Sequence, residues 1–88
     1  MIIGQKSDKT MKQKYVIMQM VTCKESDDSK VTYIKTYQKD DEGVKFTTCE
    51  RRKDAMQFNH CDCVSAMNAL NKLPIPSSER CQYFSFYA

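Results

Sequence analysis

One stretch of this chain has the residue spacing of an α-helix, and it is bounded on both sides. Asn59 is a residue type that caps helices, and Asp62 follows where the positive end of a helix favours a carboxylate. Pro74 cannot continue a helix. The apolar stripe between these limits consists of Cys63, Met67, Leu70 and Leu73, supported by Val64 and Ala66. We therefore expect one helix, from about His60 to just before Pro74.

The segments around this helix have the composition of β-strands. KYVIMQMVT (14–22) is rich in β-branched and aromatic residues, and KVTYIKTYQ (30–38) alternates with a period of two. VKFTTCE (44–50) follows a turn in which Gly43 supplies any positive φ. After the stiff connector PIPSSE, the aromatic-rich CQYFSFYA (81–88) predicts a closing strand.

This order of elements predicts an α+β fold of two layers. Three strands form an antiparallel meander, one helix packs on one face of the sheet, and a C-terminal strand closes the domain, with strand 14–22 expected at the centre. Because 88 residues leave room for one small core, we expect a single domain over 14–88. Residues 1–13 are interpreted as a polar N-terminal tail, with a natural-looking start at Met11.

A single helix covers one sheet face, so the other face stays open. The pattern leaves two alternatives for the first strand: Val16, Met18 and Met20 point inward, or Tyr15, Ile17 and Val21 do. Whichever set is outside contributes to an apolar surface of the kind that meets a partner or a second copy. The expected aromatic members of that surface are Tyr15, Tyr33 and Tyr37, with Phe46 or Tyr83.

Charge and composition limit the classes of partner. The formal net charge of +3 allows nucleic-acid binding without demanding it. No apolar run approaches the about 18 residues that span a bilayer, and the start lacks the apolar core of a signal peptide, so we expect a cytoplasmic protein without a membrane partner. Five cysteines, an odd number without even spacing, favour reduced thiols over a disulfide framework.

The string His60, Cys61, Asp62, Cys63 contains the ligand types that zinc prefers. On a helix, however, Cys61 and Cys63 lie about 200° apart around the axis and cannot share one tetrahedral ion. Cys49 or Cys61 near His60 is the one nucleophile–base pair available, but no third group to orient the base can be placed. We therefore expect no metal, no cofactor, no catalytic residues and no enzyme.

A cationic run stands just before the helix, and aromatic residues lie on the strands. The candidate partner-binding residues are Tyr33, Tyr37, Arg51, Arg52 and Lys53, because exposed aromatic and arginine side chains dominate binding energy when an interface buries them. The same combination suits single-stranded nucleic acid, whose bases stack on aromatic side chains while cations neutralise phosphates. Asp27, Asp28, Asp40, Asp41 and Glu42 in the two hairpin turns would repel a polyanion. A homodimer is compatible with either alternative.

The succession KYVI, YIKTY, FTT, DAMQF and CVSAMNALNKL resembles the small cytosolic anti-defence proteins of bacteriophages and other mobile elements, anti-CRISPR proteins among them. The resemblance covers about residues 14–73 and consists of element order, length and texture, so it transfers no functional residue. It implies a stoichiometric inhibitor that sterically blocks a bacterial defence or host complex, such as a CRISPR effector. The net positive charge departs from those inhibitors that imitate nucleic acid. The alternative is a small single-stranded nucleic-acid-binding protein.

Overall fold

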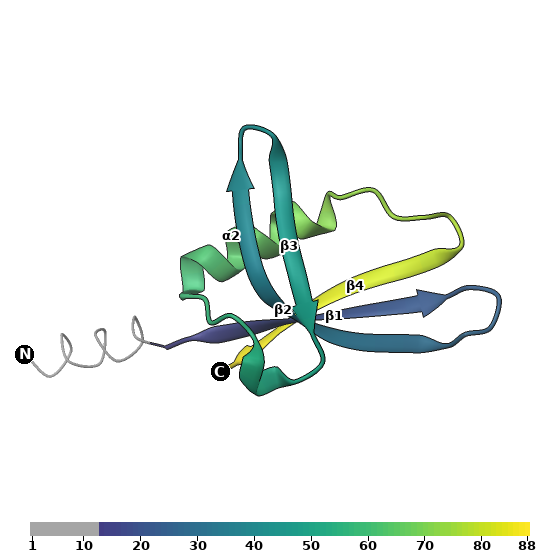
Figure 1. Cartoon of the computed structure of the whole chain (residues 1–88), viewed down its shortest axis with the longest axis horizontal. Coiled ribbons are helices and arrows are strands. Elements are labelled where there is room, and N and C mark those ends of the chain that lie inside the picture. The colour runs from purple at the N-terminus through teal and green to yellow at the C-terminus, as the bar shows by residue number, and fades with distance from the viewer. Residues whose placement is uncertain (1–12) are drawn as a thin grey trace, which may run out of the picture.

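The computed structural model describes residues 13–88, which form one four-stranded antiparallel sheet and one α-helix (Figure 1). The elements are β1 (Tyr15–Cys23), β2 (Ser29–Asp40), β3 (Gly43–Cys49), the 3-10 turn η1 (Arg52–Asp54), α2 (His60–Asn71) and β4 (Glu79–Tyr87). This confirms the predicted α+β class and element order. The predicted tail, residues 1–13, lies outside the described residues except for Gln13.

The sheet has the order β3-β2-β1-β4, so β1 is central and the chain closes by bringing β4 beside β1. The two strands pair antiparallel in an unbroken register from Tyr15↔Tyr87 to Cys23↔Glu79. On its other side β1 pairs with β2, with Met18 opposite Tyr33 and Met20 opposite Val31. The predicted meander and the central position of the first strand are both confirmed.

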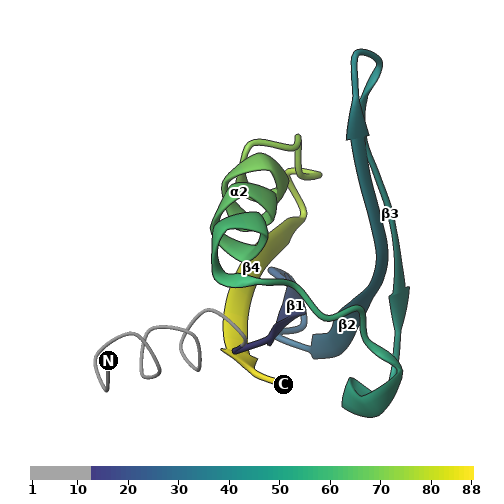
Figure 2. The ribbon, with the colours of Figure 1, turned by 90° about the vertical axis from the view of Figure 1, so that its left-hand side faces the viewer.

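A β-bulge divides β2 into two parts. Ile34 is opposite Thr48 and Thr36 is opposite Thr47, so Lys35 is the extra residue without a partner on β3. A bulge bends its strand and reverses the alternation of side chains beyond it. The outer parts of β2 and β3 therefore leave the plane of β1 and β4 as a hairpin arm, which ends at Gly43 with the expected positive φ of 125° (Figures 1 and 2).

The segment after η1 fills the space where the hairpin arm separates from β1. The Met56 N–H donates to the Ile34 carbonyl of β2 at 2.9 Å. Two residues later, Phe58 and Tyr15 exchange two backbone hydrogen bonds of 2.8 Å. Backbone groups that the divergence of β1 and β2 would leave unpaired are thereby satisfied, which matters because buried unpaired groups are costly.

The helix starts and ends where the sequence predicts. The side chain of Asn59 accepts a hydrogen bond from the backbone N–H of Asp62 at 2.8 Å, and Lys72 is the C-cap, two residues before Pro74. Figure 2 shows α2 lying above β4, with the hairpin arm rising across from it. Within residues 13–88, no helix is long and apolar enough to cross a membrane.

The core lies between α2 and one face of the sheet. Its buried members are Ile17, Ile34, Phe58, Cys63, Ala66 and Leu70. The predicted helix stripe is correct for Cys63, Ala66 and Leu70, with Met67 and Leu73 partly buried against the core. The prediction is wrong for Val64, which remains 47% exposed on the flank of α2. At about 100° per residue, Val64 is rotated away from the centre of the buried face.

Candidate functional site

The sheet presents one face to α2, and no helix within residues 13–88 covers the other face. Ile17 belongs to the core, and Gln19 and Val21 line a cavity together with Leu70 and Leu73 of the helix and its end. The odd-numbered residues of β1 therefore face α2. Because side chains alternate along a strand, the even-numbered residues face the other way. This settles the ambiguity of the sequence in favour of Ile17 and Val21 inside.

We call the surface opposite α2 the open face. The pairing of β1 with its neighbours places Met18 beside Tyr33 and Phe84, and Met20 beside Val31. Its apolar members are Val16, Met18, Met20, Val31, Tyr33, Phe84 and Phe86. Val31, Phe84 and Phe86 are 43%, 38% and 41% exposed, whereas Val16 is buried. Three adjacent strands thus contribute to one continuous apolar surface.

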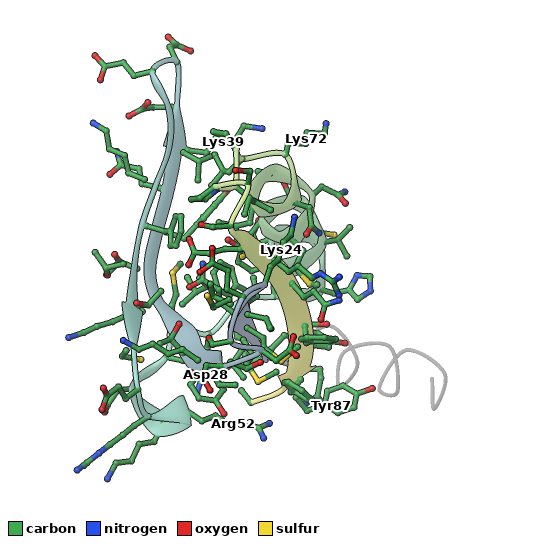
Figure 3. All side chains as sticks on the ribbon, turned by 90° about the vertical axis from the view of Figure 1, so that its right-hand side faces the viewer. Lys24, Asp28, Lys39, Arg52, Lys72 and Tyr87 are labelled. Atoms are coloured by element: carbon green, nitrogen blue, oxygen red, sulfur yellow. The ribbon has the colours of Figure 1, made fainter. Side chains whose placement is uncertain are left out.

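Arg52 of η1 lies at one end of the open face. Its guanidinium sits over the ring of Phe86, with Cζ 5.5 Å from the ring centroid, and it donates a hydrogen bond to the carbonyl of Tyr87. Figure 3 shows Arg52 beside Tyr87 at this end of the sheet. A depression of about 330 Å³ adjoins it, lined by Val16, Arg52, Lys53, Gln57 and Ala88. An apolar floor and two cationic side chains therefore lie together.

The other end of the open face is polar. The hydroxyl groups of Thr22 and Ser29 are hydrogen bonded at 2.9 Å, and Arg80 is paired with Thr22. Gln82, opposite Met20, adds an amide. Among the paired positions of β1, β2 and β4 on this face there is no carboxylate. The open face therefore has an apolar centre, a cationic end at Arg52 and Lys53, and a polar end that carries Arg80.

The five residues predicted to bind a partner are divided by the structure. Tyr33 lies on the open face, and Arg52 and Lys53 line the depression at its end. Arg51 is exposed next to η1. Tyr37 lies on the opposite side of the sheet from Tyr33, because the bulge at Lys35 reverses the alternation between them.

The predicted aromatic surface is wrong for four of its five members. Tyr15, Tyr37, Phe46 and Tyr83 all pack against the core on the helix side. The ring of Tyr37 meets Phe58 edge-on, with centroids 6.0 Å apart. The aromatic members of the open face are Tyr33, Phe84 and Phe86 instead. The alternation of Val16, Met18 and Met20 was the signal for this surface, and the pairing of β4 with β1 was needed to add the two phenylalanines.

A second hollow lies on the helix side, where the end of α2 and the connector after it face β1, β4 and Phe46 of β3. It has a volume of about 240 Å³ and is lined by apolar residues, among them Val21, Phe46, Leu70 and Leu73. At its floor the amide of Gln19 donates to the Tyr83 hydroxyl at 3.0 Å, and burial raises the pKa of Tyr83 to about 12. Figure 3 shows side chains filling much of the space between the arm and α2. Several of the lining residues pack against the core. Tyr83 remains a neutral phenol at physiological pH.

The cysteines differ from one another in exposure and in the direction of their pKa shifts. Cys61 is exposed and Cys63 is buried, and burial raises the pKa of the Cys63 thiol. Hydrogen bonds from the Ser26 hydroxyl and from backbone N–H groups of the β1–β2 turn lower the pKa of Cys23. The ring of His60 meets Tyr15 edge-on. Over residues 13–88, no three potential metal ligands come together.

Comparison of the chain with protein-family models, with curated proteins and with solved structures gives no match.

Proposed function

We propose that this protein is a non-enzymatic binding module that docks another protein on its open face. The observation that carries the proposal is the continuous apolar surface formed by Met18, Met20, Val31, Tyr33, Phe84 and Phe86. Soluble monomers rarely leave such a surface uncovered, and one bordered by polar groups is typical of an interaction site. Methionine side chains at the centre suit this role because they adapt to the shape of a partner.

The composition of the open face supports binding energy concentrated at its centre. Phe84 and Phe86 still expose more than a third of their surface, so a partner that covers them buries area that folding has left in water. Full burial of such a side chain is worth about 1.5–3 kcal/mol relative to exposure, and these two retain part of that gain for binding. The polar groups at both ends provide the rim that specific interfaces have.

The charges indicate what the partner surface carries. Arg52 and Lys53 at one end and Arg80 at the other surround an apolar centre without a carboxylate. A complementary partner has an apolar patch bordered by aspartate or glutamate. The depression next to Val16 is suited to one such acidic side chain, whose carboxylate meets the cations while its stem meets the apolar floor.

The resemblance to phage and mobile-element proteins supplies the class of partner in this proposal: a bacterial defence or host complex. In that role the protein acts as a steric inhibitor, covering a surface that the complex needs for assembly or for its own ligand. Such inhibition requires affinity and correct placement, and it requires no catalytic residue.

The test is a pull-down with the tagged full chain from a bacterial lysate that contains defence systems, with and without nuclease. We expect a near-stoichiometric protein that resists nuclease. Phe84→Glu places a charge at the centre of the open face and should reduce its recovery by about tenfold or more. Ile75→Glu is the matched control, because Ile75 is 44% exposed and lies in the connector away from this face. Equal recovery by both variants would refute docking on the open face.

Single-stranded nucleic acid is the second candidate, and one arrangement favours it. Tyr33, Phe84 and Phe86 share the open face with Arg52 and Arg80, as in platforms where bases stack and cations bind phosphates. Affinity of this kind falls steeply with salt. Nucleic acid that copurifies without nuclease, with no protein remaining after nuclease, would establish this candidate in place of protein binding.

A further inference from the structure

β4 is an edge strand, and the register shows which of its backbone groups point outward. At one end of the β1–β4 pair the Lys24 N–H donates to the Ser78 carbonyl, and at the other the Ala88 N–H donates to the Lys14 carbonyl. In an antiparallel ladder these hydrogen-bonded pairs recur at every second residue. Gln82, Phe84 and Phe86 therefore bond to β1, and the N–H and carbonyl groups of Cys81, Tyr83 and Ser85 face outward.

Within residues 13–88, no strand pairs with this outer edge. Natural proteins usually protect such edges with proline, lysine, a bulge or a covering segment. β4 contains no proline or lysine, and its register with β1 is unbroken. Its charged residues, Glu79 and Arg80, stand at the start of the strand. At the other end Arg52 donates a hydrogen bond to the carbonyl of Tyr87. The free stretch, in which the outward backbone groups have no partner among residues 13–88, therefore runs from Cys81 to Ser85.

Exposed apolar side chains lie on both layers next to β4, on the sheet itself and on α2, which contacts β4. On the open face Phe84 and Phe86 stand beside the edge. On the helix side the exposed Val64 lies on the flank of α2 turned away from the hairpin arm, since Asp62, Ser65 and Ala66 line the cavity shared with that arm. A strand added here would thus find apolar neighbours for the side chains of both its faces.

A second copy of this chain is a less suitable partner for the edge than a single extended segment. Paired strands lie about 4.8 Å apart, whereas packed helices need about 8–10 Å between their axes. Pairing of β4 with its copy about a two-fold axis places both helices on the same side of the joined sheet, and α2 lies above β4 (Figure 2). The helices of the two copies would then have to pack against each other above the joined edge, because α2 contacts both β4 and β1. A single extended segment adds no helix and needs no such contact.

We propose that β4 accepts an extended segment of a partner protein as a fifth strand, through the backbones of Cys81, Tyr83 and Ser85. The proposal rests on the proposed function in that the protein binds another protein, and it adds a second contact continuous with the open face along β4. The segment recognised is uncharged in its middle and rich in β-branched or aromatic residues. Backbone groups supply the hydrogen bonds, and the flanking side chains supply the selectivity.

The experiment uses linear peptides selected from a displayed random library against the immobilised full chain, followed by amide hydrogen exchange measured by NMR. In the free protein the amides of Cys81, Tyr83 and Ser85 should exchange fast, while those of Gln82 and Phe84 are protected by β1. A selected peptide should slow the three outward amides by about tenfold or more. A library that yields no binder, or binders that protect none of these amides, would overturn the proposal.

A substitution adds an independent readout. Ser85→Pro removes an outward N–H and leaves the bonds between β4 and β1 in place, so it should weaken peptide binding by about tenfold or more, whereas Ser85→Ala should not. If Ser85→Pro does not fold, the exchange pattern of the unmodified protein decides. Peptides that bind Ser85→Pro normally but are lost in Phe84→Glu occupy the open face, which overturns strand addition and leaves the proposed function standing. If peptides add to β4 as a strand but the pull-down recovers no protein, the proposed function is refuted and strand addition stands.

Discussion

The guanidinium of Arg52 lies 5.5 Å from the centroid of the Phe86 ring, although the two residues are 34 positions apart in the sequence. The contact joins the turn before α2 to the last strand and shields one end of the open face. Arg52→Ala should lower the free energy of unfolding by about 1–2 kcal/mol, because it removes both the exposed cation–π contact and the hydrogen bond to the Tyr87 carbonyl. Urea denaturation of both proteins measures this difference. Lys53→Ala is the control, and an equal loss there would show that the ring contact contributes nothing.

Leu70 and Val64 occupy the same helix in opposite environments. Leu70 is 1% exposed within the core, and Val64 is 47% exposed on the flank of α2. Leu70→Ala should lower the free energy of unfolding by about 2–5 kcal/mol, because it leaves a cavity that the surrounding side chains fill only in part. Val64→Ala should change stability by less than about 0.5 kcal/mol. Thermal and urea unfolding test the pair, and similar losses for both would contradict the packing of α2.

The buried phenol of Tyr83 predicts a loss of stability at high pH. Its pKa is raised from 10.0 to about 12, mainly by burial. As pH rises from 10 towards 12, the unfolded chain releases this proton and the native chain does not, so unfolding becomes more favourable. The stabilisation is complete below pH 10 and is lost as pH passes 12.

Tyr83→Phe removes this proton, so its stability should fall less over that pH window than the stability of the unmodified protein. The measurement is urea denaturation at a series of alkaline pH values, with difference absorbance of the phenolate to locate the titration. Parallel pH profiles of the two proteins would contradict the assignment. Loss of the acceptor for the Gln19 amide should lower the stability of the variant at every pH, which leaves the shape of the profile informative.

Cys23 should be the most readily alkylated of the buried and half-buried thiols. Hydrogen bonds from Ser26 and from the turn backbone lower its pKa, and the thiolate is the reactive form. Site-resolved mass spectrometry after brief treatment with iodoacetamide at neutral pH measures the rate at each cysteine. Ser26→Ala should slow labelling of Cys23 and leave Cys63, whose pKa burial raises, as the slow reference. Unchanged labelling of Cys23 in the variant would refute the role of Ser26.

The elements of this fold could be predicted because their signals are local. Asn59 and Pro74 bracket the helix through hydrogen bonding and ring geometry that involve only neighbouring residues. The period of two in the strands and the polar turns at 24–28 and 39–43 define the meander in the same way. These features determined the α+β class, the element order and, within residues 13–88, the presence of one face without a helix.

The composition of the candidate site was decided by contacts between distant parts of the chain. The bulge at Lys35 places Tyr33 and Tyr37 on opposite sides of the sheet, although strict alternation predicts that they share one. The pairing of β4 with β1 brings Phe84 and Phe86 to Met18 and Val16, and η1 then carries Arg52 to Phe86. Periodicity along one segment specifies which residues share a face of that segment. Register, bulges and strand neighbours depend on how the whole core packs, so only the tertiary structure decided which residues form the open face.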